Sequence, residues 1–276
     1  MSKKNAFYTV TTDGYMDLTR VLLKSIKKNG HKEDIIVGHD KKELSTKNQT
    51  ELKNIFGAKL ISFSKIKCPH CKPLQERWNS NVLLKLNAFS FEGYNKVFVL
   101  DADCILLDNV SEVFERRERY LFTLTNNIDK KGALPISGAS MLITPDNRLY
   151  KEFIEIAKLP GSRDDGKWHA TEEDMLRAKF SNYTICKEWR KQHNVTQETE
   201  GVGVLGREYN TFYSKDEMLS GLPQTEKKEV KIFHFMNWGF LHKPSVLKEE
   251  SFLTVVEYYN KYYQLKKENV HRFTTL

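Results

Sequence analysis

Two aspartates one residue apart, Asp101 and Asp103, follow directly on the apolar run KVFVL at residues 96–100. Residues i and i+2 of an extended segment point to the same side, so both carboxylates would face one way. Paired carboxylate oxygens suit Mg²⁺ or Mn²⁺, whose further partner in proteins is commonly a substrate phosphate. The pattern therefore indicates a metal site for a diphosphate, although acids at a strand end also serve as turn residues.

The elements that would position these acids alternate between strand and helix. The first half of the chain predicts strands at residues 6–11, 34–38, 58–63 and 96–100, and helices at 18–30, 47–56 and 81–89. The second half predicts strands at 120–125, 140–144 and 230–235, and helices at 149–158 and 171–179. This order favours an α/β fold with a largely parallel sheet. Ligands of such sheets bind beyond the carboxyl ends of the strands, where residues 11–15 and 101–103 would share one pocket.

Composition narrows the class of protein. The chain has 276 residues, 39% of them hydrophobic, and a formal net charge of +8, which indicates a folded domain that attracts anions. The absence of any nucleic-acid-binding motif ranks nucleic acid last among anionic partners, after a phosphorylated substrate and an anionic membrane. Four cysteines and an N-terminus without a signal-like apolar stretch predict a cytoplasmic protein.

Several stretches in order along residues 6–247 resemble the retaining glycosyltransferases of family 8, in particular the glycogenin and galactinol synthase branch. The resemblance is carried by TVTTDGY at 9–15, KLNAF at 85–89, YNKVFVLDAD at 94–103, SG at 137–138, EED at 172–174, YN at 209–210 and KIFHF at 231–235. It implies a GT-A fold, a Rossmann-like and mostly parallel sheet flanked by helices, in a single domain over residues 1–247.

The resemblance also implies a donor and its ligands. The donor would be a nucleotide sugar, most often linked to UDP, with a divalent ion, Mn²⁺ or alternatively Mg²⁺. An imidazole added to two carboxylates moves the preference of a site toward Mn²⁺. The implied metal ligands are Asp101, Asp103 and His234; Lys85 and Lys243 would offset diphosphate charge; Thr11, Asp13 and Tyr15 would hold the nucleoside; Ser137 and Gly138 would border the sugar.

By the same resemblance Glu172 and Glu173 stand beside the reacting sugar, and with Lys85 they form the expected catalytic set. A carboxylate there would act as nucleophile or stabilise an oxocarbenium-like centre, whereas front-face attack assisted by the leaving phosphate needs neither role. Thr171 followed by three acids is equally good chemistry for a helix start. Capping and catalysis both stay open for this segment.

The C-terminal segment, residues 248–276, is basic and aromatic at helical spacing. A helix packed on the domain is the first interpretation, and contact with the inner face of an anionic membrane is the second. A homodimer also stays open.

The sequence as a whole predicts a hexosyltransferase that uses UDP-glucose, UDP-galactose or UDP-N-acetylglucosamine. Its acceptor hydroxyl would belong to a glycan, a lipid-linked glycan, a polyol or a protein. The alternatives are a catalytically silent domain that binds nucleotide sugars, and a nucleotidyltransferase.

Overall fold

The computed structural model describes residues 3–69, 81–124, 136–160, 171–182, 184–211 and 230–235. The chain divides into two compact units. The first unit comprises Met1–Asp13, Glu33–Asp101 and Glu112–Leu205, and the second comprises Gly14–Lys32, Ala102–Ser111 and Gly206–Leu276.

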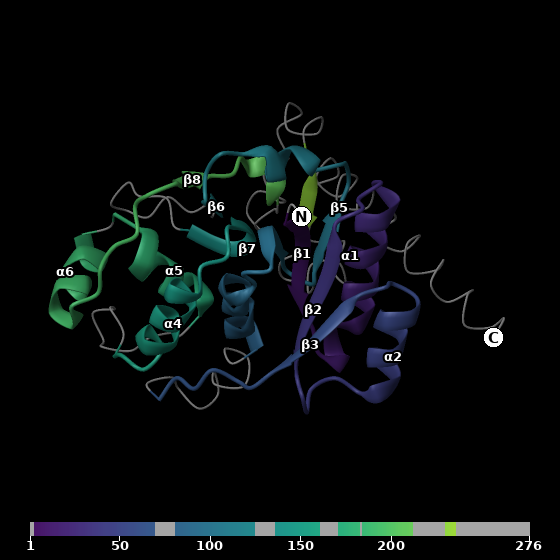
Figure 1. Ribbon diagram of the computed structural model, residues 1–276, viewed down its shortest axis with the longest axis horizontal. Coiled ribbons are helices and arrows are strands. Elements are labelled where there is room, and N and C mark those ends of the chain that lie inside the picture. Colours follow the sequence, from purple (N-terminus) through teal and green to yellow (C-terminus); the bar gives the residue numbers. More distant parts are fainter. Residues whose placement is uncertain are drawn as a thin grey trace, which may run out of the picture. The chain divides into compact units, whose positions relative to one another are not determined.

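A seven-stranded sheet in the order β3-β2-β1-β4-β7-β6-β8 forms the centre of the first unit (Figure 1). Its strands are β1 (Lys4–Val10), β2 (Asp34–Asp40), β3 (Lys59–Phe63), β4 (Tyr94–Leu100), β6 (Tyr120–Leu124), β7 (Ile136–Ile143) and β8 (Val202–Val204). Strands β3, β2, β1 and β4 run parallel, β7 is antiparallel to both β4 and β6, and β8 is parallel to β6. The expected mostly parallel sheet is therefore confirmed.

Alternate residues of the central strands build the core of this unit. Tyr8, Val97, Val99 and Met141 are buried in one hydrophobic cluster together with Phe89. Helices α4 (Asn147–Ile156), α5 (Glu172–Phe180) and α6 (Thr184–His193) also contribute buried side chains to this cluster. Because side chains alternate along a strand, this face of β4 packs into the core, and Asp101 follows directly after the strand.

The segment expected as a helix at residues 81–89 is a 3-10 helix, η2 (Leu83–Ser90), and its side chains explain the tight turn. The Leu84 carbonyl accepts hydrogen bonds from Asn87 Nδ2 and from Tyr8 Oη, both at 2.8 Å. Every residue from 83 to 89 is buried, so no polar stripe at the α-helical period exists. Side-chain bonds over three residues suit i to i+3 turns better than α-helical ones.

Helix α2 (Thr46–Asn54) in the first unit and helix α1 (Met16–Lys28) in the second match the helices expected at 47–56 and 18–30. The C-terminal glycine signal of α1 is also correct, since Gly30 has φ +83°. The sequence interpretation did not include α6, β8 or the short strand β5 (Cys104–Leu106).

The second unit pairs β5 with β9 (Ile232–His234) in an antiparallel ribbon. Helix α1 is joined to β5, because Ser25 Oγ accepts from the Leu106 N–H and Asn29 Nδ2 donates to the Leu106 carbonyl, both at 3.0 Å. In register, Cys104 lies opposite His234. The ribbon thus places the residue after Asp103 beside the histidine.

Among the described residues, none of the helices combines the length and apolarity needed to cross a membrane. The tail at 248–276 lies outside the described residues, so its helix and its membrane contact stay predictions.

Candidate active site

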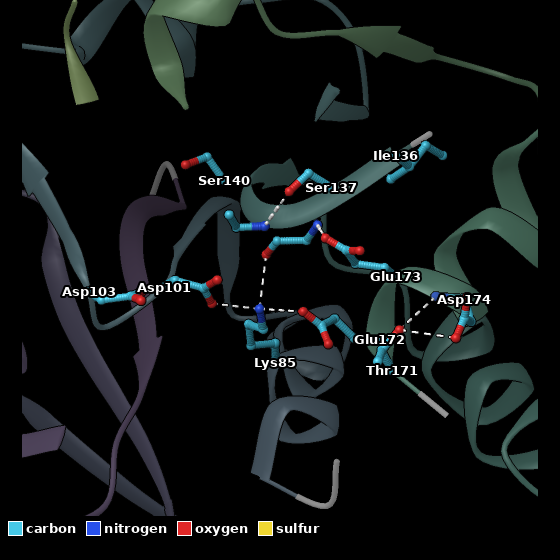
Figure 2. A network of polar contacts seen from close by, with 12 residues as sticks. Lys85, Asp101, Asp103, Ile136, Ser137, Ser140, Thr171, Glu172, Glu173 and Asp174 are labelled. Atoms are coloured by element: carbon cyan, nitrogen blue, oxygen red, sulfur yellow. Dashed lines mark hydrogen bonds and ion pairs between the residues drawn. The ribbon is translucent and has the colours of Figure 1, made fainter. Parts of the chain in front are cut away.

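Lys85 is the centre of a polar cluster in the first unit. Its side chain is only 4% exposed and comes from η2. The ammonium group contacts Asp101 Oδ1 at 2.5 Å, the Gly138 carbonyl at 3.2 Å and Glu172 Oε1. Figure 2 shows Lys85 between Asp101 and Glu172. One lysine therefore connects the residue that ends β4 to the first residue of α5.

Asp101 and Gly138 are held by the sheet itself. The Asp101 N–H donates to the Ala139 carbonyl at 2.9 Å, which continues the β4–β7 pairing past the end of β4. A Cβ atom at Gly138 would lie 2.6 Å from Glu172 Oε1, well inside contact distance. Only glycine leaves room for Glu172 to reach Lys85 at this point of β7.

The start of α5 brings two glutamates to this cluster. Thr171 Oγ1 accepts from the Asp174 N–H at 3.3 Å, so Thr171 is the N-cap that its sequence position indicated. Glu173 accepts at Oε1 from the Gly138 N–H at 3.2 Å and at Oε2 from Arg177 at 3.0 Å. The two glutamates are thus directed toward β7 and Lys85, while Thr171 alone caps the helix (Figure 2).

The charges of this cluster do not balance. Burial by itself would lower the pKa of Lys85, but Asp101 and Glu172 raise it well above its usual value. Burial raises the pKa of Glu172, although Lys85 opposes the shift. Burial and the neighbouring Glu172 likewise raise the pKa of Glu173. The single charge of Lys85 is shared between Asp101 and Glu172, while Glu173 pairs with Arg177, so the acids around Lys85 favour a proton or a further cation.

A second cluster lies in the other unit. Asp103 Oδ1 lies 3.2 Å from His234 Nε2, and His234 Nδ1 lies 3.1 Å from Asn210 Oδ1. With Nδ1–H donated to Asn210, the Nε2 lone pair faces the Asp103 carboxylate. Within the described part of the chain, Asp103, Cys104 and His234 have ligand atoms all within 4.8 Å of one another. This donor set fits a divalent ion.

The expected nucleoside residues are less closely grouped. Thr11 is buried and its N–H donates to the Gly38 carbonyl at 3.0 Å. Asp13 Oδ1 accepts from Ser45 N–H, Ser45 Oγ and Asn48 Nδ2 at 2.7 to 3.0 Å, which ties the end of β1 to the start of α2. Tyr15 belongs to the second unit and is 43% exposed.

The expected residues therefore fall into separate groups. The first unit joins Lys85, Asp101, Gly138, Glu172 and Glu173, and it places Ser137 beside them in β7 with Oγ accepting from the Ala139 N–H. The second joins Asp103 and His234. Lys243 lies outside the described residues, and the assignments to nucleoside, sugar and metal stay predictions.

The sequence did not predict two residues that hold side chains of these clusters in place. Arg177 holds Glu173, and its i, i+4 spacing from that acid was the available signal. Asn210, which orients His234, stands in the YN pair but had no assigned role. Its distance of 24 residues from His234 made the contact invisible before the fold was known.

Comparison with known proteins bears on the identity of the chain. No protein-family model matches it. Glycogenin-1 of Mus musculus is 24% identical over 168 residues, which is 59% of this chain and 43% of glycogenin-1. The sequence is therefore similar to that of a family 8 glycosyltransferase. Because it spans less than half the length of glycogenin-1, the activity of that whole protein does not transfer directly.

Solved structures show the fold of the chain. The bifunctional glycosyltransferase WbbM matches with a TM-score of 0.59 at 12% identity, covering 86% of this chain and 46% of WbbM. The galactosyltransferase LgtC, solved with donor and acceptor sugar analogues, matches with a TM-score of 0.56 at 11% identity, covering 95% of each chain. The expected GT-A fold is therefore confirmed.

Proposed function

We propose that the chain is a metal-dependent retaining glycosyltransferase that moves a hexose from a UDP-sugar to an acceptor hydroxyl. One observation carries the proposal: in a GT-A fold, buried Lys85 connects the aspartate that ends β4 to a glutamate of α5. Strand ends of α/β sheets are where ligands bind, and acids with raised pKa values are typical of reaction sites. The donor sugar would be glucose, galactose or N-acetylglucosamine.

Asp103 and His234 would hold the ion, with Asp101 as the expected third ligand. The donor chemistry fits, since Nδ1 of His234 is engaged by Asn210 and Nε2 is directed at a carboxylate. Two carboxylates with one imidazole favour Mn²⁺, with Mg²⁺ as the alternative. When bound, such an ion supplies a Lewis acid for the charge that develops on the departing diphosphate.

Glu173 is the better candidate for the group beside the anomeric carbon. It is partly exposed, with 30% of its side chain accessible, whereas Glu172 is buried at 6% and contacts Lys85. Two donors, Gly138 N–H and Arg177, fix the two oxygens of Glu173. A carboxylate held in this way would stabilise positive charge on the sugar or attack it. Lys85 and Glu172 would then position Asp101 and Gly138.

The same proposal assigns the remaining contacts with the donor. Thr11, Asp13 and Tyr15 would bind the nucleoside, Ser137 and Gly138 would border the sugar, and Lys243 would offset diphosphate charge. Glycans, lipid-linked glycans, polyols and proteins are the acceptor classes, and LgtC, solved with an acceptor sugar analogue, supports a saccharide first. A cytoplasmic location, membrane contact through the tail and a homodimer belong to the same proposal.

Release of free UDP from a panel of UDP-sugars, with Mn²⁺, with Mg²⁺ and with chelator, tests the proposal without knowledge of the acceptor. We expect Mn²⁺-dependent hydrolysis of one sugar, lost in Asp103→Asn and retained in Glu155→Gln, whose side chain is 69% exposed. UDP release that is unchanged by chelator and by Asp103→Asn would refute the metal-dependent mechanism.

The two alternatives give different results in the same experiment. A silent binding domain would bind UDP-sugar in calorimetry and release no UDP. A nucleotidyltransferase would form or consume diphosphate from a nucleoside triphosphate and a sugar phosphate.

A further inference from the structure

Cys104 lies beside the two residues of the second cluster because of the strand register. Cys104 and His234 are directly opposite in the β5–β9 ribbon. The His234 N–H donates to the Thr211 carbonyl, and the Phe235 N–H donates to the Asp103 carbonyl, both at 2.9 Å. The His234 N–H is thus directed away from β5, so Cys104 and His234 form a non-hydrogen-bonded pair, in which side chains approach closely.

The histidine ring adds a positioned nitrogen donor to this cluster. Asn210 is buried, and its amide oxygen can only accept, so Nδ1 of His234 carries the proton of the hydrogen bond they share at 3.1 Å. Nε2 then directs a lone pair at Asp103 Oδ1, 3.2 Å away. Asp103 therefore faces Nε2 through a shared positive charge, which either a proton on Nε2 or an ion bound in its place supplies.

Cys104 adds a sulfur to this pair. Its side chain is buried at 1%, and its Sγ lies within 4.8 Å of both the His234 nitrogen and the Asp103 oxygen. A buried cysteine surrounded by apolar groups acts as a small hydrophobic residue. Here the sulfur instead shares its surroundings with an imidazole and a carboxylate. A site with sulfur, nitrogen and oxygen donors binds Zn²⁺ and Co²⁺ more tightly than it binds Mn²⁺.

We propose that Cys104 is a metal ligand, which makes the Asp103–Cys104–His234 site select zinc-like divalent ions over Mn²⁺. The thiol loses its proton to solvent when the sulfur binds the ion, and no oxidant or reductant takes part. The inference rests on the proposed function only in placing an ion at Asp103 and His234. It deepens that proposal, because it predicts which ion the site holds most tightly.

Titration of the metal-free full-length protein with Co²⁺ tests the proposal directly. A sulfur ligand produces an intense thiolate-to-cobalt charge-transfer band in the near ultraviolet, which oxygen and nitrogen ligands do not. We expect this band in the wild type, its loss in Cys104→Ser and in Cys104→Ala, and its retention in Cys186→Ser. Cys186 is a matched control because it is also free and buried. Circular dichroism checks that each variant is folded.

Competition between metals supplies a second readout. We expect Cys104→Ser to weaken Zn²⁺ binding by about tenfold or more and to change Mn²⁺ binding much less, because sulfur contributes little to Mn²⁺ affinity.

Three results would overturn the proposal: no binding of Co²⁺, binding without the charge-transfer band, or a band that survives in both Cys104 variants. Failure of the glycosyltransferase proposal looks different, since the band would be present while no UDP-sugar is turned over with any ion.

Discussion

Gly138 shows at the scale of one residue how the acidic cluster depends on close packing. A methyl group at this position would lie 2.6 Å from Glu172 Oε1 and 2.9 Å from its Cγ. We expect Gly138→Ala to displace Glu172 and to cost about 1–3 kcal/mol of unfolding free energy, as overpacked sites do. Gly93→Ala is the matched control, since nothing lies within 4 Å of the added carbon. Denaturant unfolding of both variants measures the difference, and equal stabilities would contradict the packing argument.

Loss of Lys85 would leave two acids without the cation that they share. Lys85→Met would leave the carboxylates of Asp101 and Glu172 without the ammonium group that neutralises them. Removing one partner of a buried ion pair costs about 3–5 kcal/mol, and we expect a loss of that order. The double variant Lys85→Met/Glu172→Gln should recover part of the lost stability, because the uncompensated charge of Glu172 is then removed. Chemical denaturation of the two single variants and the double variant tests this, and strictly additive losses would argue against coupling.

Asn210 acts on metal binding through the orientation of His234. Asn210→Leu removes the acceptor for Nδ1–H, and we expect metal affinity to fall about tenfold, as with other partners of ligating histidines. Asn210→Asp keeps an acceptor and should keep affinity. Electron paramagnetic resonance of free Mn²⁺ during titration measures both constants. Wild-type affinity in Asn210→Leu would show that Asn210 does not orient the ring.

At the scale of elements, the N-terminus of α5 joins stability to chemistry. Thr171→Ala removes the cap at Asp174 N–H and should cost about 1 kcal/mol. Because Glu172 and Glu173 are the first two residues of this helix, fraying should also lower the rate of UDP release. Thr171→Ser retains a capping hydroxyl and should restore both properties. Loss of stability with full activity would separate the cap from the placement of the glutamates.

The elements also show what sequence patterns can and cannot predict. Strands β1, β2, β3 and β4 and helix α1 were predictable, because apolar periodicity and the glycine signal at Gly30 are local. The 3-10 geometry of η2 was not, since it depends on Tyr8 reaching the Leu84 carbonyl across 76 residues. The hydrogen bonds from Ser45 and Asn48 to Asp13 Oδ1 were likewise not predictable, because these residues lie 32 and 35 positions away along the chain.

The same limit applies to the candidate site at the scale of the molecule. The sequence predicted candidate site residues, among them Lys85, Asp101 and Glu172, because each of them belongs to a stretch that resembles a family motif. Their mutual contacts were not predictable, since the Gly138–Lys85 and His234–Asn210 contacts depend on how distant segments meet. Arg177 was missed because it belongs to none of the motif stretches.

The whole molecule carries a formal net charge of +8, which should attract a nucleotide-sugar diphosphate over a distance. Salt screens such attraction, with a Debye length of about 10 Å at 0.1 M. We therefore expect the apparent KM for UDP-sugar to rise with sodium chloride, while the KM for a neutral saccharide acceptor stays nearly constant. Steady-state kinetics at several ionic strengths measure both, with sucrose at matched osmolality as control. A donor KM independent of salt would mean that binding rests on close contacts alone and that the basic surface serves another anionic partner.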